Sequence, residues 1–182
     1  MEVEIRVARP GDASRLAALS IQVWLSTYVT DGVRRDMANY VLSEFTPVNF
    51  EALIADPAHH LLLVEQDDFL IGYVLLKRDS RCRGCDFATV EVERLYLVES
   101  RTGEGLGRRL LQAARRWALA LPEPARLWLT VWHGNERAIA FYRRLEMEVH
   151  GECYFELEGA RHLNYVMLDS ASVGAALIAA DV

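Results

Sequence analysis

The sequence predicts an α/β fold, and three observations support that prediction. Short apolar runs typical of strands alternate with longer stretches in which apolar residues recur at helical spacing. The expected order of elements along the chain is β-α-α-α-β-β-β-α-β-α-β-β. A length of 182 residues with 52% apolar residues suits one domain with a full core. We therefore expect a single domain over residues 1–169 and a C-terminal tail, frayed or helical, over residues 170–182.

The N-terminal part should fold as one strand followed by three helices. Asp12 is the expected N-cap of the first helix because an Asp side chain can accept from the free amides there. Thr46 followed by Pro47 is a cap residue with proline at the first helical position, which begins the third helix. The expected ranges are 3–8 for the strand and about 10–26, 33–44 and 47–56 for the helices.

Three strands are expected next. Asp67 and Asp68 separate two β-rich runs and indicate a hairpin turn between them. Gly72 lies inside the second run and suggests a bulge. The expected strands cover residues 61–66, 69–77 and 87–98.

The C-terminal half should continue with two helices and three more strands. Pro122 and Pro124 end the first of these helices, and Asn135 begins the second. Glu158 and Gly159 form the turn of a closing hairpin. The expected ranges are about 105–120 and 135–145 for the helices and 125–132, 147–157 and 161–168 for the strands.

The turn between the long strand and the first C-terminal helix is rich in glycine. Gly103, Gly105 and Gly107 alternate, so the backbone can take positive φ and approach a ligand without a side chain in the way. Free amide N–H groups and the helix N-terminus would then favour an anion. Arg108 and Arg109 stand in the first turn, where the dipole would favour acidic residues. The pattern therefore predicts a site for a phosphate or pyrophosphate.

The familiar phosphate-binding loops do not fit this stretch. A Walker A loop needs a Lys that is missing, and a dinucleotide fingerprint needs glycine where Arg108 stands. A kinase glycine-rich loop would lead into a strand, whereas a helical pattern follows here. A plain glycine-rich turn without a ligand remains the alternative.

Charge and targeting signals limit the function classes further. The net charge of −6 argues against a general nucleic-acid binder and is compatible with a cationic substrate such as an amine. The N-terminus reads as a charged strand rather than a signal or transit peptide. No apolar run reaches the length that spans a bilayer, so we expect no membrane partner and a cytoplasmic location.

Cys82 and Cys85 form a C-x-x-C motif. A structural zinc site would need two more ligands, and the sequence holds no second paired Cys/His cluster. A redox motif would begin a helix, whereas this one lies in a polar link between strands. We expect incidental loop thiols and no metal, with an accessory metal or redox role as the alternative.

The motifs in their order resemble the GNAT superfamily of acyl-CoA-dependent N-acyltransferases. The strand LYLV followed by TGEGLGR resembles the pyrophosphate loop of that family, whose pattern is R/Q-x-x-G-x-G/A. The strand LWLTVW followed by HGNERAIAFYRRLEM is similar to the family pattern of Asn before a helix that ends in Phe-Tyr. The closing hairpin ends in YVML, and the match covers about residues 3–169. The resemblance implies a mixed, mostly antiparallel sheet of six to seven strands flanked by helices on both faces.

The same resemblance implies acetyl-CoA as co-substrate, with its pyrophosphate on the glycine turn. Two positions depart from the family pattern. Thr102 stands at the Arg/Gln position, with Arg101 shifted by one, and Glu146 stands where a capping glycine is expected. The turn residues that the resemblance assigns to the cofactor are Thr102, Gly103, Glu104, Gly105, Leu106, Gly107 and Arg108. The backbone N–H groups of Leu95, Tyr96 and Leu97 are the expected donors to the oxyanion and acyl-CoA if the strand splays from its neighbour.

Acetyl transfer to an amine needs a base, because an alkylamine with a pKa of about 10.4 is mostly protonated at neutral pH. Glu93 is our leading candidate and Glu91 the second, since both alternate on one face of the strand before the acyl-CoA segment. Solvent-facing glutamates paired with Lys or Arg across the strands are the alternative. Tyr142 is the expected general acid for the leaving thiolate, or else a core tyrosine. Asn135 caps its helix and contacts the cofactor, although capping alone would explain it.

Acceptor recognition is expected from aromatic residues. Trp24 and Tyr28 lie four apart on one helical face, and with Trp132 and His133 they would line an amine-sized slot, unless the first two belong to the core. The N-terminal pattern resembles the branch that contains polyamine N-acetyltransferases, which implies a small primary amine. Acetylation of a protein N-terminus or lysine, and a non-catalytic acyl-CoA-binding regulatory domain, remain alternatives. A homodimer is the common arrangement of the family.

Overall fold

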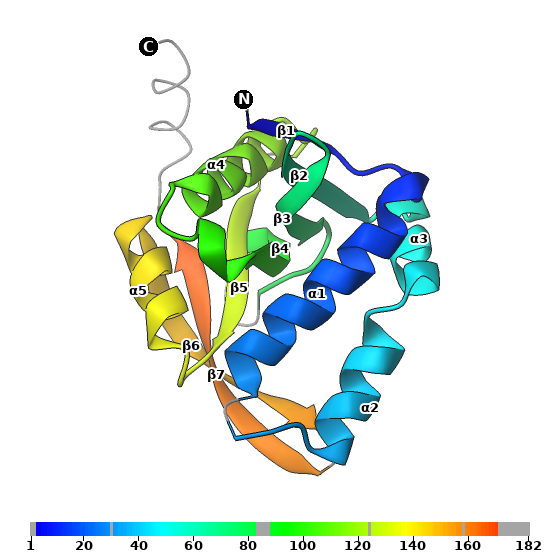
Figure 1. Ribbon diagram of the computed structural model, residues 1–182. Helices are drawn as coiled ribbons and strands as arrows, with labels where there is room; N and C mark the ends of the chain where they lie inside the picture. Colours follow the sequence, from blue (N-terminus) through cyan, green and yellow to red (C-terminus); the bar gives the residue numbers. More distant parts are fainter. Residues whose placement is uncertain (1–2, 30, 83–87, 124, 158, 171–182) are drawn as a thin grey trace. The chain divides into compact units, whose positions relative to one another are not determined.

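The computed structural model describes residues 3–29, 31–82, 88–123, 125–157 and 159–170 (Figure 1). Backbone contacts divide the chain into two compact units. Unit 1 comprises residues 1–76 and 94–111, and unit 2 comprises residues 77–93 and 112–182. The single domain expected over residues 1–169 stays a prediction, and the expected tail lies outside the described residues except for Ser170.

The fold class predicted from the sequence is confirmed. The seven strands follow one another in the order β1-β2-β3-β4-β5-β7-β6, which is a mixed and mostly antiparallel arrangement. The register of β4 with β5 is parallel. The strands are β1 (Glu4–Val7), β2 (His59–Gln66), β3 (Phe69–Lys77), β4 (Ala88–Leu97), β5 (Arg126–Trp132), β6 (Met147–Leu157) and β7 (Ala160–Asp169).

The helices agree with the sequence patterns to within about three residues at their ends. Thr46 caps α3 as expected, because its side chain accepts from the amide of Asn49. The α-helices are α1 (Ala13–Tyr28), α2 (Arg35–Glu44), α3 (Pro47–Ala55), α4 (Leu106–Leu119) and α5 (Glu136–Arg144), with two short 3-10 turns, η1 (Pro10–Asp12) and η2 (Glu99–Arg101).

In unit 1, the apolar faces of α1 and α3 pack together over β2 and β3 (Figure 1). Leu16, Phe50, Leu63 and Leu75 are fully buried in this core. The sequence of β3 is a nearly continuous apolar run, so its side chains are buried on both faces of the sheet. The core therefore fixes the N-terminal helices on the first strands of the sheet.

The turn between β2 and β3 forms as the sequence predicts. Asp67 and Asp68 take φ of 51° and 67°, and two central residues with positive φ are typical of a tight hairpin turn. The structure gives a reason of its own for glycine at position 72. A Cβ at this position would collide with the carbonyl oxygen of Tyr96 and the side chain of Leu97, so glycine permits a close approach of the β4 backbone.

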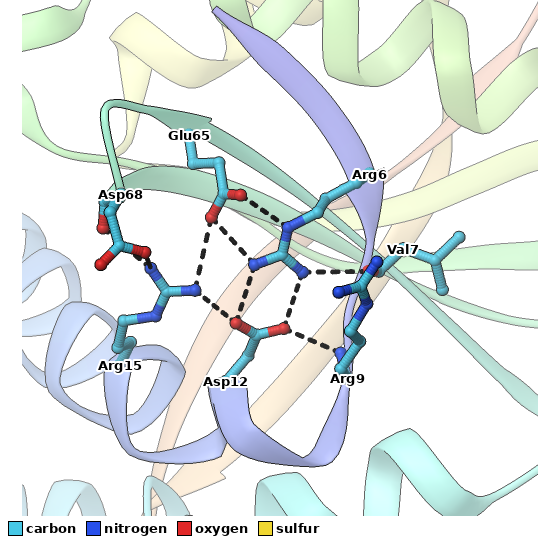
Figure 2. Close-up of polar contacts among 7 residues, drawn as sticks. All are labelled: Arg6, Val7, Arg9, Asp12, Arg15, Glu65 and Asp68. Atoms are coloured by element: carbon cyan, nitrogen blue, oxygen red, sulfur yellow. Dashed lines mark hydrogen bonds and ion pairs between the residues drawn. The ribbon is translucent and has the colours of Figure 1, made fainter.

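Asp12 stands at the N-cap position of α1, but its side chain makes no capping bond to that helix, which corrects the sequence-based expectation. Instead, Arg6 donates two hydrogen bonds, of 2.8 and 2.9 Å, to the carboxylate of Asp12 (Figure 2). Arg6 also donates to both oxygens of Glu65, at 2.6 and 2.9 Å. Arg15 contacts Asp12 as well, and the amide of Arg9 donates to it at 2.8 Å.

This Arg6–Asp12 cluster joins β1, the start of α1 and the end of β2. Only 4% of Asp12 is exposed, so the carboxylate is ionised in a buried place because two guanidinium groups surround it. The Arg6 hydrogen bonds hold the pKa of Asp12 far below its usual range, against the opposing effect of burial. The sequence separation between Arg6 and Glu65 explains why local patterns did not reveal the cluster.

In unit 2, β7 pairs with both β5 and β6, and β6 with β7 forms a long hairpin (Figure 1). Arg115 of α4 donates to both oxygens of the buried Asp169 at 2.8 and 2.9 Å. The same guanidinium also donates to the carbonyl of Leu145 at the end of α5. One arginine therefore ties two helices to the end of β7.

Glu146 follows α5 with φ of 62°, the left-handed conformation that the family pattern assigns to glycine. Its amide donates to the carbonyl of Arg143 at 3.1 Å, and its own carbonyl accepts from the amide of Ser170 at 2.9 Å. The helix therefore ends in the expected geometry although the residue carries a side chain. An L residue in this conformation costs about 1–2 kcal/mol.

We predict that Asp12→Asn lowers the free energy of unfolding by about 3 kcal/mol at pH 7, because Arg6 loses one of its two charged partners and Arg15 loses its buried one. The pKa of Asp12 is lower in the folded state than in the unfolded state. Its ionised carboxylate therefore stabilises the fold at a pH above the unfolded pKa of about 3.9, and this stabilisation is lost as the pH falls. The difference from wild type should therefore shrink below pH 4 in urea titrations.

The control is Asp68→Asn, since the Asp68 side chain is 97% exposed and its pair with Arg15 should contribute less than about 0.5 kcal/mol. A difference between Asp12→Asn and wild type that stays constant from pH 7 to pH 3 would contradict this account of the cluster.

We also predict that Glu146→Gly stabilises the protein by about 1 kcal/mol, because glycine adopts the left-handed conformation without steric cost. Thermal unfolding should show a rise in Tm of roughly 2–4 °C. Glu146→Ala removes the same carboxylate and keeps a Cβ, so it should show no such gain. Equal stabilisation by both substitutions would assign the effect to charge rather than to the backbone.

Candidate active site

The glycine turn of unit 1 is open, as the sequence predicts. Gly103 and Gly105 take φ of 90° and 77°, and no atom lies within 4 Å of a Cβ built on either residue. Thr102, Glu104 and both of these glycines are exposed, whereas Leu106 and Gly107 are buried at the start of α4. The main-chain groups of this turn are therefore accessible to a ligand on one side and supported by the core on the other.

The departure from the family pattern at Thr102 and Arg101 has a structural explanation in this turn. The Thr102 hydroxyl donates to the carbonyl of Glu99 at 2.8 Å, so its side chain completes η2. Arg101 is held by Glu104 at 2.7 Å and by Gln66 at 3.1 Å. The hydrogen bond from Arg101 lowers the pKa of Glu104, which keeps this carboxylate ionised and paired beside the turn.

The two arginines that follow the turn differ in their environment. Arg109 donates to the carbonyl of Val3 at 3.0 Å, so its charge is directed toward the N-terminal strand. Arg108 is exposed, and no partner for its guanidinium is found in the described part of the chain. Arg108 is therefore the cation of this turn that is available to an anion.

Glu91 and Glu93 lie in unit 2 and have different partners. Ser80 donates to Glu91 at 2.7 Å, and the indole N–H of Trp128 donates to the Ser80 carbonyl at 2.6 Å. Glu93 lies 3.7 Å from the ammonium nitrogen of Lys77, and 25% of its side chain is exposed. The register of β4 with β5 shifts between residues 88 and 90, upstream of both glutamates, so they remain on one face of β4.

Leu95, Tyr96 and Leu97 belong to unit 1, and all three are half-buried. Tyr96 packs against Tyr73 with ring centroids 5.5 Å apart, and burial raises the pKa of its phenol well above the usual value. The Tyr96 side chain is therefore held in the core of unit 1. The role expected for the backbone donors of this segment stays a prediction.

Tyr142 and Asn135 lie on α5 in unit 2. The Asn135 side chain accepts from the amide of Ala138 at 3.1 Å, which confirms it as the N-cap of α5. Tyr142 is 8% exposed and packs against Phe141 with ring centroids 5.1 Å apart. The fold thus holds the tyrosine ring in one place, and its role as an acid stays a prediction.

The aromatic residues expected at the acceptor lie in different environments. Trp24 is 7% exposed and belongs to the core of unit 1, where its ring is 5.1 Å from that of Tyr28. In unit 2, His133 is exposed, and its ring lies 5.8 Å from that of the half-buried Trp132. Tyr28 is also half-buried. Of the N-terminal pair, therefore, only Tyr28 reaches the surface to a substantial degree.

Arg94 is a residue that the sequence analysis did not identify. Its side chain is 14% exposed and lies over the ring of Phe45, 5.2 Å from the centroid, and it pairs with Glu44. Burial raises the pKa of the fully buried Tyr73 to about 12, and the positive charge of Arg94 opposes that rise. The signal in the sequence was one charged residue within the apolar end of a strand. Its partner lies 50 residues away in the sequence, so local patterns did not reveal the contact.

No group of three metal-binding side chains gathers in the described residues. Cys82 is buried against Val166, beside Trp128 and Cys153, whereas Cys85 lies outside the described residues. None of the helices in the described ranges has the length and apolar character that crossing a bilayer requires.

Comparison with known sequences identifies relatives over most of the chain. An uncharacterised N-acetyltransferase of Mycobacterium bovis is 29% identical over 162 residues, which cover 86% of this chain and 96% of the relative. An uncharacterised N-acetyltransferase of Lactobacillus delbrueckii subsp. lactis is 27% identical over 161 residues, or 86% of this chain and 90% of the relative.

Solved structures share the fold. The PaiA N-acetyltransferase of Thermoplasma acidophilum, solved with coenzyme A, superposes with a TM-score of 0.72 at 20% identity and covers 91% of this chain and 98% of its own. The sequence model of the acetyltransferase (GNAT) family matches residues 24–147, which include the glycine turn, the candidate bases and Tyr142. The chain therefore belongs to the acetyltransferase (GNAT) family, whose members transfer an acyl group from acyl-CoA to an amine.

Proposed function

We propose that this protein transfers the acetyl group of acetyl-CoA to a primary amine of a small, polyamine-like molecule. The open glycine turn is the observation on which the proposal depends. Gly103 and Gly105 leave space where side chains would stand, and Arg108 has no partner among the described residues. Exposed amides, a helix N-terminus and an available cation together favour a diphosphate.

Main-chain donors of residues 102–108 would hold the pyrophosphate of the cofactor. The ion pair between Arg101 and Glu104 leaves the turn with little net charge of its own, so the amides and Arg108 would supply most of the attraction. The fully apolar and buried Leu106 anchors the turn to the core, which keeps these donors in place without a ligand. A preorganised site of this kind loses little entropy on binding.

The reaction would proceed by direct attack of the amine on the thioester carbonyl. A C–N bond forms and the C–S bond breaks, so the amine must lose a proton and the thiolate must gain one. We assign Glu93 as the base that accepts the proton of the amine, with Glu91 as the second candidate. Tyr142 would donate a proton to the thiolate.

Two observations support a small cationic acceptor. The net charge of the chain is −6, and α1 and α2 carry aromatic residues that attract cations. A spermidine N-acetyltransferase SpeG chimera of Vibrio cholerae and hSSAT also shares this fold, with a TM-score of 0.66 at 16% identity over 97% of this chain and 99% of its own. Its specificity belongs to that protein, and the acceptor of this chain needs a direct test.

Gly105→Val should weaken binding of coenzyme A at least about 100-fold in isothermal titration. A branched side chain at φ of 77° is strained and would stand in the space where the diphosphate is expected. Gly11→Ala is the matched control, because the space around Gly11 is also open but its backbone is not in the left-handed region. Unchanged affinity in Gly105→Val would refute the proposed cofactor site.

Tyr142→Phe should lower kcat about 100-fold in a thiol-release assay over a panel of amines, with little change in the affinity for acetyl-CoA. Glu93→Gln should lower kcat similarly, while Glu91→Gln should have a smaller effect. Cofactor binding without turnover on any amine would favour a regulatory domain, and turnover on peptides alone would favour a protein acetyltransferase. Equal losses of cofactor affinity in Tyr142→Phe and Gly105→Val would count against the assigned acid.

A further inference from the structure

Two hydroxyl groups in the core of unit 1 have fixed hydrogen-bond donors. Ser20 donates to the carbonyl of Leu16 at 2.6 Å, so its hydroxyl proton is used. Tyr73 must therefore donate its own proton to Ser20, at 2.7 Å. The positive charge of Arg94 lowers the pKa of Tyr73 against the larger effect of burial, so the guanidinium acts on the same buried cluster.

The partner of Arg94 is a carboxylate that reaches the surface. Ser20 and Tyr73 are fully buried and the Arg94 side chain is 14% exposed, whereas 40% of the Glu44 side chain is exposed. Arg94 bonds the Oε1 atom of Glu44. Within the described residues, Oε2 of Glu44 accepts no hydrogen bond. Glu44 is therefore held firmly on one side and presents its second oxygen outward.

The position of Glu44 favours a second cation. It is the last residue of α2, where the helix dipole favours positive charge and opposes a carboxylate. The carbonyls of Ser43 and Glu44 are already satisfied by the side-chain amide of Asn49, at 2.8 and 2.9 Å. These two carbonyls of the last turn of α2 therefore already have a donor.

Tyr40 stands four residues before Glu44 in α2, so the two side chains share one face of that helix. The ring of Tyr40 lies 5.2 Å from that of Trp24 and 6.0 Å from that of Phe45. Tyr40 is half-buried, and its pKa is raised by burial and then by the charge of Glu44, which places the phenol in the field of the carboxylate. A carboxylate oxygen beside aromatic faces is an arrangement that binds an alkylammonium group.

We propose that Glu44, with Tyr40 beside it, anchors the non-reacting ammonium group of a diamine acceptor. This inference rests on the proposed acetyl transfer and adds a specificity-determining residue to it. Arg94 acts as the positioning residue, because it fixes the direction of the Glu44 carboxylate from the buried side. A monoamine lacks the second cation and gains nothing from this anchor.

The test compares binding of 1,4-diaminobutane and butylamine to the full-length chain, by isothermal titration in the presence of coenzyme A. Wild type should bind the diamine at least about fivefold more tightly, and Glu44→Gln should remove that preference. Glu51→Gln is the matched control, because it removes one exposed carboxylate from the neighbouring α3, and it should keep the preference.

The single variant Glu44→Gln leaves Arg94 without its carboxylate and could unfold. The double variant Arg94→Met with Glu44→Gln removes both charges, and it should also bind the diamine and the monoamine equally. No preference for the diamine in wild type, or a preference that survives loss of Glu44, would overturn the proposal. Binding is measured without turnover, so this failure is distinct from absence of acetyl transfer, which the thiol-release assay reports.

Discussion

The glycine turn between β4 and α4 is the constraint on which the proposed chemistry depends. A diphosphate can approach main-chain amides only where no side chain intervenes, and Gly103 and Gly105 meet this condition with positive φ and open space. The turn is supported from behind by the buried Leu106, so the amides are fixed before a ligand arrives.

Buried arginines organise the regions that carry the helices. Arg6 joins Asp12 to Glu65 across unit 1, Arg115 joins Asp169 to the end of α5 in unit 2, and Arg94 joins Glu44 to the ring of Phe45. Each guanidinium presents several donors in one plane, so one side chain fixes several elements at once. A buried charge is stable only when its partners are present, so removing one partner strongly destabilises the fold.

The Arg94 arrangement also has a consequence for specificity. A core of aromatic rings alone would attract cations without a defined direction, whereas a carboxylate held by a buried arginine gives one oxygen a fixed orientation. In the proposed site, hydrophobic packing and acceptor recognition would share residues of α1 and α2. Mutations in this region would change stability and specificity together, so the two effects must be separated by a pair of acceptors that differ in one charge.

Local patterns in the sequence determined the order of elements, the hairpin turn at Asp67 and Asp68, the caps at Thr46 and Asn135, and the open glycine turn. These features depend on residues within a few positions of one another, so periodicity and turn chemistry suffice to predict them. Only the tertiary structure assigned Asp12 to Arg6 rather than to its helix, and Trp24 to the core. It also revealed the Arg94–Glu44 pair, whose partners are 50 residues apart, because contacts between distant segments arise only when the chain packs.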